Sequence, residues 1–236
     1  MDYNEFDQKK NLSRTIGWSF IASIAVGVLA SIFVSSGIDI NLSADIAKTA
    51  ENMLAAEQRV QAKAYLSLFT FMLQAFIMVG LFLILRLYGP VLALWALLVG
   101  SSAALLGLAG AVSAMNVALI ADNSAFDTLA SNSEQLMLAG IQVTTDYTSF
   151  HLALILNSIA MAAIFYLFLK SRLIPKLISA WGIFASLFVA ITIVARDFIP
   201  ILGHNSITGA FMVSNLIAIV ALGLYLGVKG IRKPQH

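Results

Sequence analysis

Seven residues within or beside the apolar stretches carry side chains that can bind polar ligands or transfer protons: Glu57, Tyr147, His151, Ser158, Arg196, Asp197 and His204. Imidazole and carboxylate groups serve as general acids and bases, and a guanidinium binds anions. His151 follows Asp146 by five residues, inside a stretch with no further charge before Lys170. Ionisable groups in a membrane span are costly and often functional. The seven residues therefore predict a ligand-binding site, in which no catalytic residue is assigned.

The same residues also have a plainer interpretation. Tyr147, His151 and Ser158 share one helical face, so the His151 ring could simply hydrogen-bond a neighbouring helix. Six ionisable residues belong to the same end of the spans: Glu57, Asp146, His151, Arg196, Asp197 and His204. They form either one buried network or a set of loop ends in water, and the sequence leaves both interpretations open.

Glu57 is placed unusually for an acid. At 100° per residue it falls in the middle of an apolar stripe formed by Ile46, Ala50, Met53, Val60 and Ala64. A carboxylate centred on an apolar face is unfavourable without a partner. We therefore expect Glu57 to face protein and to pair with a group on another span; the alternative is an acid at the water boundary. Four amides inside the spans are expected to hydrogen-bond between helices: Gln74, Asn116, Asn157 and Asn215.

Several kinds of chemistry find little support in the sequence. The chain has no cysteine, which removes disulfides, thiolate metal ligands and cysteine nucleophiles. No HxxxH or HExxH spacing appears, so no metal site is predicted, and cofactors remain unknown. Serine-nucleophile elbows and glycine-rich phosphate loops are also missing. The clustered basic residues suit anionic lipid headgroups, so no nucleic-acid partner is expected.

Long uncharged stretches set the architecture that positions these residues. Of the 236 residues, 60% are hydrophobic and 11% are charged, against about 25% charged in a typical soluble domain. Six stretches can each supply the ~20 apolar residues that cross a bilayer as a helix. The sequence predicts an all-α, polytopic membrane bundle forming one domain over residues 1–236. The expected spans are 15–36, 64–87, 91–115, 147–169, 177–195 and 206–228, with a short external helix between the first two.

Basic residues are distributed unevenly across the predicted spans. With a cytoplasmic N-terminus, ten lie on the inner side: Lys9, Lys10, Arg14, Arg86, Lys170, Arg172, Lys176, Lys229, Arg232 and Lys233. Four lie on the outer side: Lys48, Arg59, Lys63 and Arg196. This positive-inside bias predicts that both termini are cytoplasmic. In the first span, Ser23, Gly27 and Ser31 recur every fourth residue, which predicts a face for close helix packing.

Three segments resemble a known family: "IAKTAENMLAAEQ", "LYGPVLALWALL" and "FHLALILNSIAMAAIFYLFLKSRLIPKLISAWGI". They are similar to a bacterial family of six-span integral membrane proteins called domain of unknown function 4386, over residues 40 to 225. The family's recurring positions correspond here to Asn52, Glu57, Pro90, His151, Ser171 and Pro175. The family has an arginine a few residues after the acid, where this chain has Gln61 with Arg59 nearby. The resemblance implies a multi-pass location in the bacterial inner membrane and no particular activity.

Three hypotheses for function follow. The first is a membrane protein that binds or passes a small or lipid-like molecule through a pocket in the outer half of the bundle, with Glu57, His151 and Arg196 on its wall. The second is a structural or assembly module without a ligand. The third is an intramembrane hydrolase that uses His151 with a carboxylate or a metal. The lipid bilayer is the one partner the composition requires, and the oligomeric state stays open.

Overall fold

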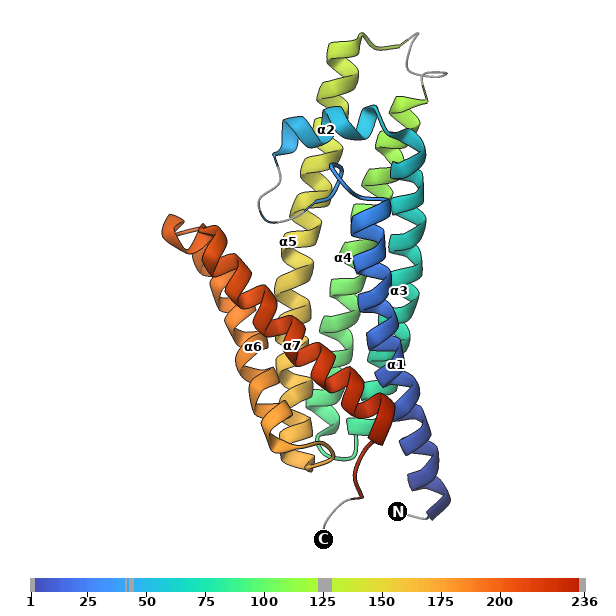
Figure 1. The fold of residues 1–236 in the computed structure, drawn as a ribbon, viewed down its shortest axis with the longest axis vertical. Coiled ribbons are helices and arrows are strands. Elements are labelled where there is room, and N and C mark those ends of the chain that lie inside the picture. Colours follow the sequence, from blue (N-terminus) through green and yellow to red (C-terminus); the bar gives the residue numbers. More distant parts are fainter. Residues whose placement is uncertain (1–2, 41, 43–44, 123–128, 234–236) are drawn as a thin grey trace. The chain divides into compact units, whose positions relative to one another are not determined.

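The computed structural model of the protein is entirely helical in its regular elements over the residues it describes, which are 3–40, 42, 45–122 and 129–233. The elements are α1 (Tyr3–Phe33), α2 (Ile46–Leu54), α3 (Glu57–Leu85), α4 (Pro90–Ala121), α5 (Asn132–Ser171), α6 (Lys176–Arg196), the 3₁₀ turn η1 (Pro200–Gly203) and α7 (Asn205–Lys229) (Figure 1). All but α2 and η1 are long and apolar enough to cross a membrane. The predicted all-α class with six spans is confirmed, and the chain is a multi-pass membrane protein.

Several helices extend beyond their predicted spans, because the apolar pattern marks only the part of a helix that lies in lipid. α1 begins at Tyr3, twelve residues before the expected start, and its polar first turns carry a Glu5–Lys9 ion pair of 2.7 Å. α5 runs for 40 residues. It begins at Asn132, fifteen residues before the expected start of its span at residue 147.

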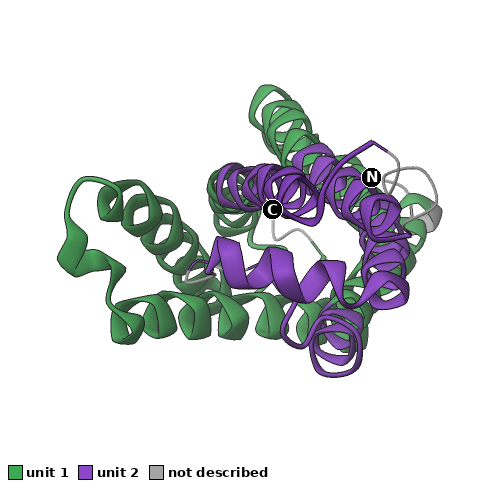
Figure 2. Ribbon diagram, turned by 90° about the horizontal axis from the view of Figure 1, so that it is seen from above, with its two compact units in different colours: residues 1–23, 73–103, 154–236 green, residues 24–72, 104–153 purple. Residues whose placement is uncertain are grey.

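The chain forms two compact units (Figure 2). Unit 1 comprises residues 1–23, 73–103 and 154–236, and unit 2 comprises residues 24–72 and 104–153. Each has its own apolar core. The helices α1, α3, α4 and α5 each contribute a segment to both units. The single domain expected from the sequence stays a prediction.

Unit 1 is held together by close backbone approaches between helices. A Cβ atom on Gly17 of α1 would lie 2.6 Å from the Gly223 carbonyl oxygen and would also clash with the Gly227 nitrogen, both on α7. Within the same unit, the amide of Gln74 on α3 donates to Asn157 on α5 at 3.2 Å. This pair confirms the expected interhelical role of both amides.

Unit 2 places α2 crosswise to its long helices, as Figures 1 and 2 show. The short helix predicted between the first two spans is therefore present, with Asp45 capping it through a 3.1 Å hydrogen bond from the Lys48 amide. Thr49, Ala50 and Met53 are its buried residues.

In the part of α1 that belongs to unit 2, a Cβ built on Gly27 has no atom within 4 Å, so the close helix packing predicted around this glycine is wrong. Asn116 of α4 donates to Gln142 on α5 at 3.1 Å, which confirms the interhelical role expected of this amide.

Candidate functional site

Side chains of α2 and α3 donate hydrogen bonds to the loop between α1 and α2. Arg59 donates from Nε to the Val34 carbonyl at 2.9 Å and from Nη2 to the Ser36 carbonyl. Asn52 Nδ2 donates to the Gly37 carbonyl at 2.7 Å. Gly37 has a φ of +80°, a left-handed conformation that glycine adopts without steric cost. These donors satisfy carbonyls in the segment that directly follows α1.

Lys63 of α3 connects this loop to α5. Its Nζ donates to Asp146 Oδ2 at 3.0 Å and to the Ile38 carbonyl at 3.4 Å. The two charged side chains are 13% and 12% exposed, so the ion pair is largely desolvated. A Cβ on Gly110 of α4 would collide with Asp146 Oδ1, which shows that this glycine leaves room for the carboxylate.

Asp39 adds a second carboxylate to this pair. It is half-buried, directly follows Ile38, and lies near enough to Lys63 and Asp146 for their charges to act on its pKa. Burial raises the pKa of Asp39 above its ordinary value of 3.8; Lys63 opposes the rise, Asp146 adds to it, and a hydrogen bond with Ser31 opposes it. We call Asp39, Lys63 and Asp146 the charged cluster of unit 2.

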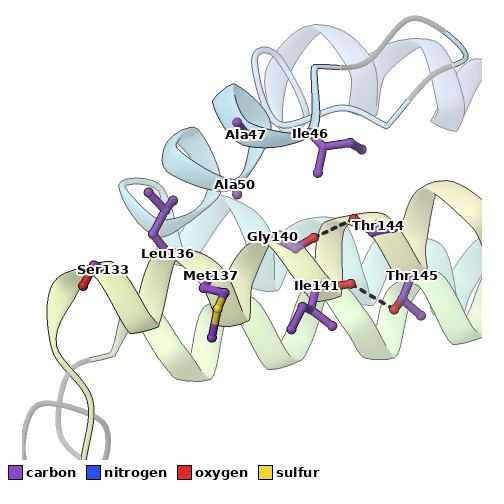
Figure 3. Close-up of a pocket in the computed structure, with 10 residues that line it drawn as sticks. All are labelled: Ile46, Ala47, Ala50, Ser133, Leu136, Met137, Gly140, Ile141, Thr144 and Thr145. Atoms are coloured by element: carbon purple, nitrogen blue, oxygen red, sulfur yellow. Dashed lines mark hydrogen bonds between the residues drawn. The ribbon is translucent and has the colours of Figure 1, made fainter.

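A groove of about 650 Å³ lies between α2 and the first turns of α5. Its lining residues are Ile46, Ala47, Ala50, Ser133, Leu136, Met137, Gly140, Ile141, Thr144 and Thr145 (Figure 3). The hydroxyls of Thr144 and Thr145 donate to the carbonyls of Gly140 and Ile141, at 2.9 and 3.0 Å. Because these threonines satisfy their donors within the helix, the groove offers a ligand mainly apolar contacts.

Of the seven predicted site residues, unit 2 contains Glu57, Tyr147 and His151. Glu57 is half-buried, and its carboxylate accepts a 2.9 Å hydrogen bond from Gln61, one turn further along α3. Among the described residues, the hydrogen-bond partner of Glu57 lies on its own helix, so the prediction that Glu57 pairs with a group on another span is wrong. The cause is local: Glu57 is the first residue of α3, and an amide four residues on lies on the same face.

His151 is 9% exposed, so the expectation that protein shields it is confirmed. The centroid of its ring lies 6.1 Å from that of the Tyr147 ring, with the planes tilted by 43°. The predicted neighbourhood of these two rings is therefore present. A role for either residue in ligand binding stays a prediction.

Unit 1 contains the other four predicted residues: Ser158, Arg196, Asp197 and His204. Ser158 is buried on α5, and Arg196 ends α6. Asp197 is exposed at the C-cap of α6. His204 is exposed at the N-cap of α7, where its Nδ1 accepts a 3.3 Å hydrogen bond from the Ser206 amide. None of the seven predicted residues lines the groove.

The sequence-based set omits the three residues of the charged cluster. Lys63 and Asp146 do have a sequence signature, because each is the last charge before an uncharged stretch long enough to span a bilayer. Asp39 has a related signature, because it is the first charge after the uncharged stretch that follows Arg14. Within the part of the chain that the structure describes, no group of three or more His, Asp and Glu side chains could hold a metal ion.

Comparison with known proteins places the chain in a family. No curated protein matches it, and no solved structure does. A family profile matches residues 15–230, a range that includes α2 to α7 and most of α1. The resemblance noted in the sequence over residues 40 to 225 is thereby confirmed. The chain belongs to the family described as Domain of unknown function (DUF4386).

Proposed function

We propose that this membrane protein binds an apolar, lipid-like molecule in the groove between α2 and α5. The groove itself is the observation that carries the proposal. Its volume of about 650 Å³ falls within the ~300–1,000 Å³ of typical ligand sites, and its lining is mostly apolar. Met137 and Ile141 are 61% and 53% exposed, so the apolar surface is open to an incoming molecule.

The membrane setting favours a lipid as the occupant. The α5 wall of the groove, Ser133 to Thr145, directly precedes the predicted span 147–169, so the groove lies at the membrane boundary, within reach of lipids of the adjacent leaflet. The threonine hydroxyls that a polar ligand would need already bond to their own helix. Asp146 follows Thr145 directly, which places the charged cluster next to one end of the lining sequence.

Groove-filling substitution tests the proposal. Gly140 lines the groove, and a built Cβ there has no atom within 4 Å, so Gly140→Leu starts from open space and adds bulk to the groove. Gly107 of α4 is equally open and lies outside the groove lining, which makes Gly107→Leu the matched control. Native mass spectrometry of each purified protein then measures the bound lipid. We expect Gly140→Leu to lower lipid occupancy about tenfold relative to Gly107→Leu, which corresponds to ~1.4 kcal/mol.

Equal occupancy in the two variants would contradict groove binding and favour a structural or assembly module. A hydrolase using His151 would instead reveal itself by turnover of added lipid, lost in His151→Gln. Both outcomes are measured with the same purified proteins.

We also propose a location and orientation for the chain. The bacterial inner membrane is supported by the family resemblance, and cytoplasmic termini are supported by the ten-to-four distribution of basic residues. In this orientation Lys63, and with it the rest of the charged cluster, belongs to the outer side of the membrane. The groove then opens towards the outer leaflet or the space beyond it.

A further inference from the structure

A short strap of chain, residues 230–233, follows α7 in unit 1. Gly230 starts it in a left-handed conformation, with a φ of +70°, and a Cβ there would lie 2.8 Å from the Lys10 side chain of α1. The Ile231 amide donates to Ser13 Oγ on α1 at 3.0 Å, and Ile231 is buried. The first two residues of the strap are therefore packed against α1.

The next two residues of the strap are basic and exposed, and each is held by a contact. The Arg232 amide donates to the Leu173 carbonyl, between α5 and α6, at 2.8 Å. Arg232 Nε donates to the Tyr225 hydroxyl on α7 at 2.8 Å, and the Nη groups carry the other four donors of the guanidinium. Lys233 Nζ lies 5.7 Å from the centre of the Phe6 ring. Both cations thus have defined positions at the surface of unit 1.

The contacts of the strap gather basic residues from three parts of unit 1. The Lys10 side chain lies beside Gly230, and Lys229 ends α7 directly before it. Arg172 directly precedes Leu173, whose carbonyl accepts from the strap. We call the resulting group of five basic residues the strap site: Lys10, Arg172, Lys229, Arg232 and Lys233.

Few acids oppose the strap site in the described part of α1. Glu5 is paired with Lys9 at 2.7 Å, and Asp7 brings one negative charge against five positive ones. An excess of Lys and Arg beside a membrane span attracts anionic lipid headgroups. The charge of the strap site is therefore complementary to a phosphate group.

The strap site adjoins apolar surface that suits acyl chains. α7 has no charged residue before Lys229, so the site lies where this span ends. Trp18 of α1 lies against α7, since a Cβ on Gly227 would be 3.1 Å from the indole, and tryptophan is enriched at the headgroup level of a bilayer. Trp18, Leu224 and Val228 are 51%, 46% and 55% exposed. Exposed apolar side chains thus lie next to the cations.

We propose that the strap site binds an anionic phospholipid. Its cations hold the phosphodiester, and the exposed apolar side chains of α1 and α7 lie along the acyl chains. This apolar surface favours a lipid over free phosphate, which gains nothing from it. In the proposed orientation the lipid belongs to the inner leaflet. The inference goes beyond the proposed function, because the groove belongs to unit 2 and the strap to unit 1.

The bonds of the strap should raise its affinity for the lipid. Side chains that are already positioned lose less conformational freedom when a ligand binds. Gly230→Ala tests this contribution without changing any charge. An alanine is strained at a φ of +70°, and its Cβ would displace the strap from the Lys10 side chain.

Lipid selectivity of the full chain in a zwitterionic detergent provides the main measurement. The probes are phosphatidylglycerol and phosphatidylcholine with the same acyl chains, and native mass spectrometry gives the Kd of each. We expect the native protein to prefer phosphatidylglycerol about tenfold. The double variant Arg232→Gln, Lys233→Gln should lose this preference. The control Arg86→Gln, Lys176→Gln removes the same two residue types from exposed positions on other turns of unit 1, and should keep it.

Three results would overturn the proposal. The first is an equal loss of preference in the two double variants, which would assign the effect to the overall charge of unit 1. The second is displacement of phosphatidylglycerol by a large excess of inorganic phosphate, which would indicate a soluble anion. The third is a native preference in Gly230→Ala, which would remove the role of the strap. Thermal unfolding of each variant establishes that the protein measured is folded.

The two proposals fail separately. The groove is mainly apolar, so a lipid there should be bound whether its headgroup is charged or zwitterionic. Gly140→Leu should therefore lower the occupancy of both lipids and keep the preference for phosphatidylglycerol at the strap site. Loss of that preference in Gly140→Leu, with the double variant Arg232→Gln, Lys233→Gln unaffected, would move the anionic lipid to the groove and overturn the strap site.

Discussion

Lys63 and Asp146 illustrate what a buried ion pair contributes at the scale of single residues. Both side chains lose most of their hydration, and their 3.0 Å contact compensates for that loss. Removing one partner leaves the other charge desolvated and unpaired. The stability lost in this way exceeds the difference in stability between the intact ion pair and two neutral side chains of similar size. The pair therefore acts as a unit, and its members should show strong energetic coupling.

A double-mutant cycle measures this coupling. We expect Lys63→Met and Asp146→Asn each to lower the free energy of unfolding by about 2–4 kcal/mol. The double variant should be less destabilised than the sum of the two, by ~1–3 kcal/mol. Thermal unfolding in one detergent, at one pH near 7, provides the comparison. Additive effects would show that the two side chains do not interact.

His151 provides a second test at this scale. Its ring is buried beside Tyr147 but does not line the groove. We expect His151→Gln to retain the fold and the bound lipid, because Gln can still hydrogen-bond and the groove is untouched. Native mass spectrometry and thermal unfolding report the two properties. A folded variant that has lost its lipid would favour the sequence-based assignment of His151 to the ligand site.

Among the helices, the contact between α1 and α7 depends on glycines that let the backbones approach. Gly17 faces Gly223 and Gly227, and an added Cβ would meet backbone atoms that cannot rotate away. The repeat Ser23, Gly27 and Ser31 looked like the packing face in the sequence, but Gly27 has open space around it. A small residue permits close packing, and only the position of the partner helix shows whether the space is used.

Gly17→Ala and Gly27→Ala form a matched pair on α1. We expect Gly17→Ala to lower the free energy of unfolding by about 1–3 kcal/mol, since overpacking displaces the helices. Gly27→Ala should be neutral or stabilising by up to ~1 kcal/mol, because Ala favours a helix and meets no neighbour. Thermal unfolding in detergent distinguishes them. Equal melting temperatures would contradict the close approach at Gly17.

The boundary between α2 and α3 shows what helix patterns leave undetermined. No Gly or Pro occurs between Gly37 and Gly80, so the sequence allows one helix to run from the outer segment into the second span. The structure breaks it at Ala55 and Ala56 instead. The break lets α2 bury Ala50 and Met53, both 0% exposed, in the core of unit 2. Tertiary burial here outweighs the preference of the local sequence for a continuous helix.

For the molecule as a whole, the basic residues predict the orientation in the membrane. Reporter fusions after Ser36, Ala121 and Gly203 should all report the outer side, since each follows an odd-numbered span. The physical reason is the excess of Lys and Arg on the other side, which resists translocation. Fusions after Arg86 and Arg172 serve as inner controls. A cytoplasmic reading at any of the first three sites would disprove this topology.

The sequence by itself determined the class of the protein, the number of its spans and its family. A bilayer imposes the same requirement on every span, about 20 apolar residues with their backbone bonded internally, so the pattern of charges along the chain is sufficient. It also predicted the hydrogen-bonding roles of Gln74, Asn116 and Asn157, because an amide in a span needs a partner on some neighbouring helix.

Only the tertiary structure decided which residues meet. Lys63 and Asp146 are 83 positions apart, and nothing near either residue in the sequence identifies the other. The groove likewise joins residues of α2 to residues of α5. His204 looked like a ligand-binding group, yet it accepts the Ser206 amide at the start of α7. A side chain's chemistry is set by its type, but its partner is set by how the helices pack, and helical periodicity carries no information about which faces come together.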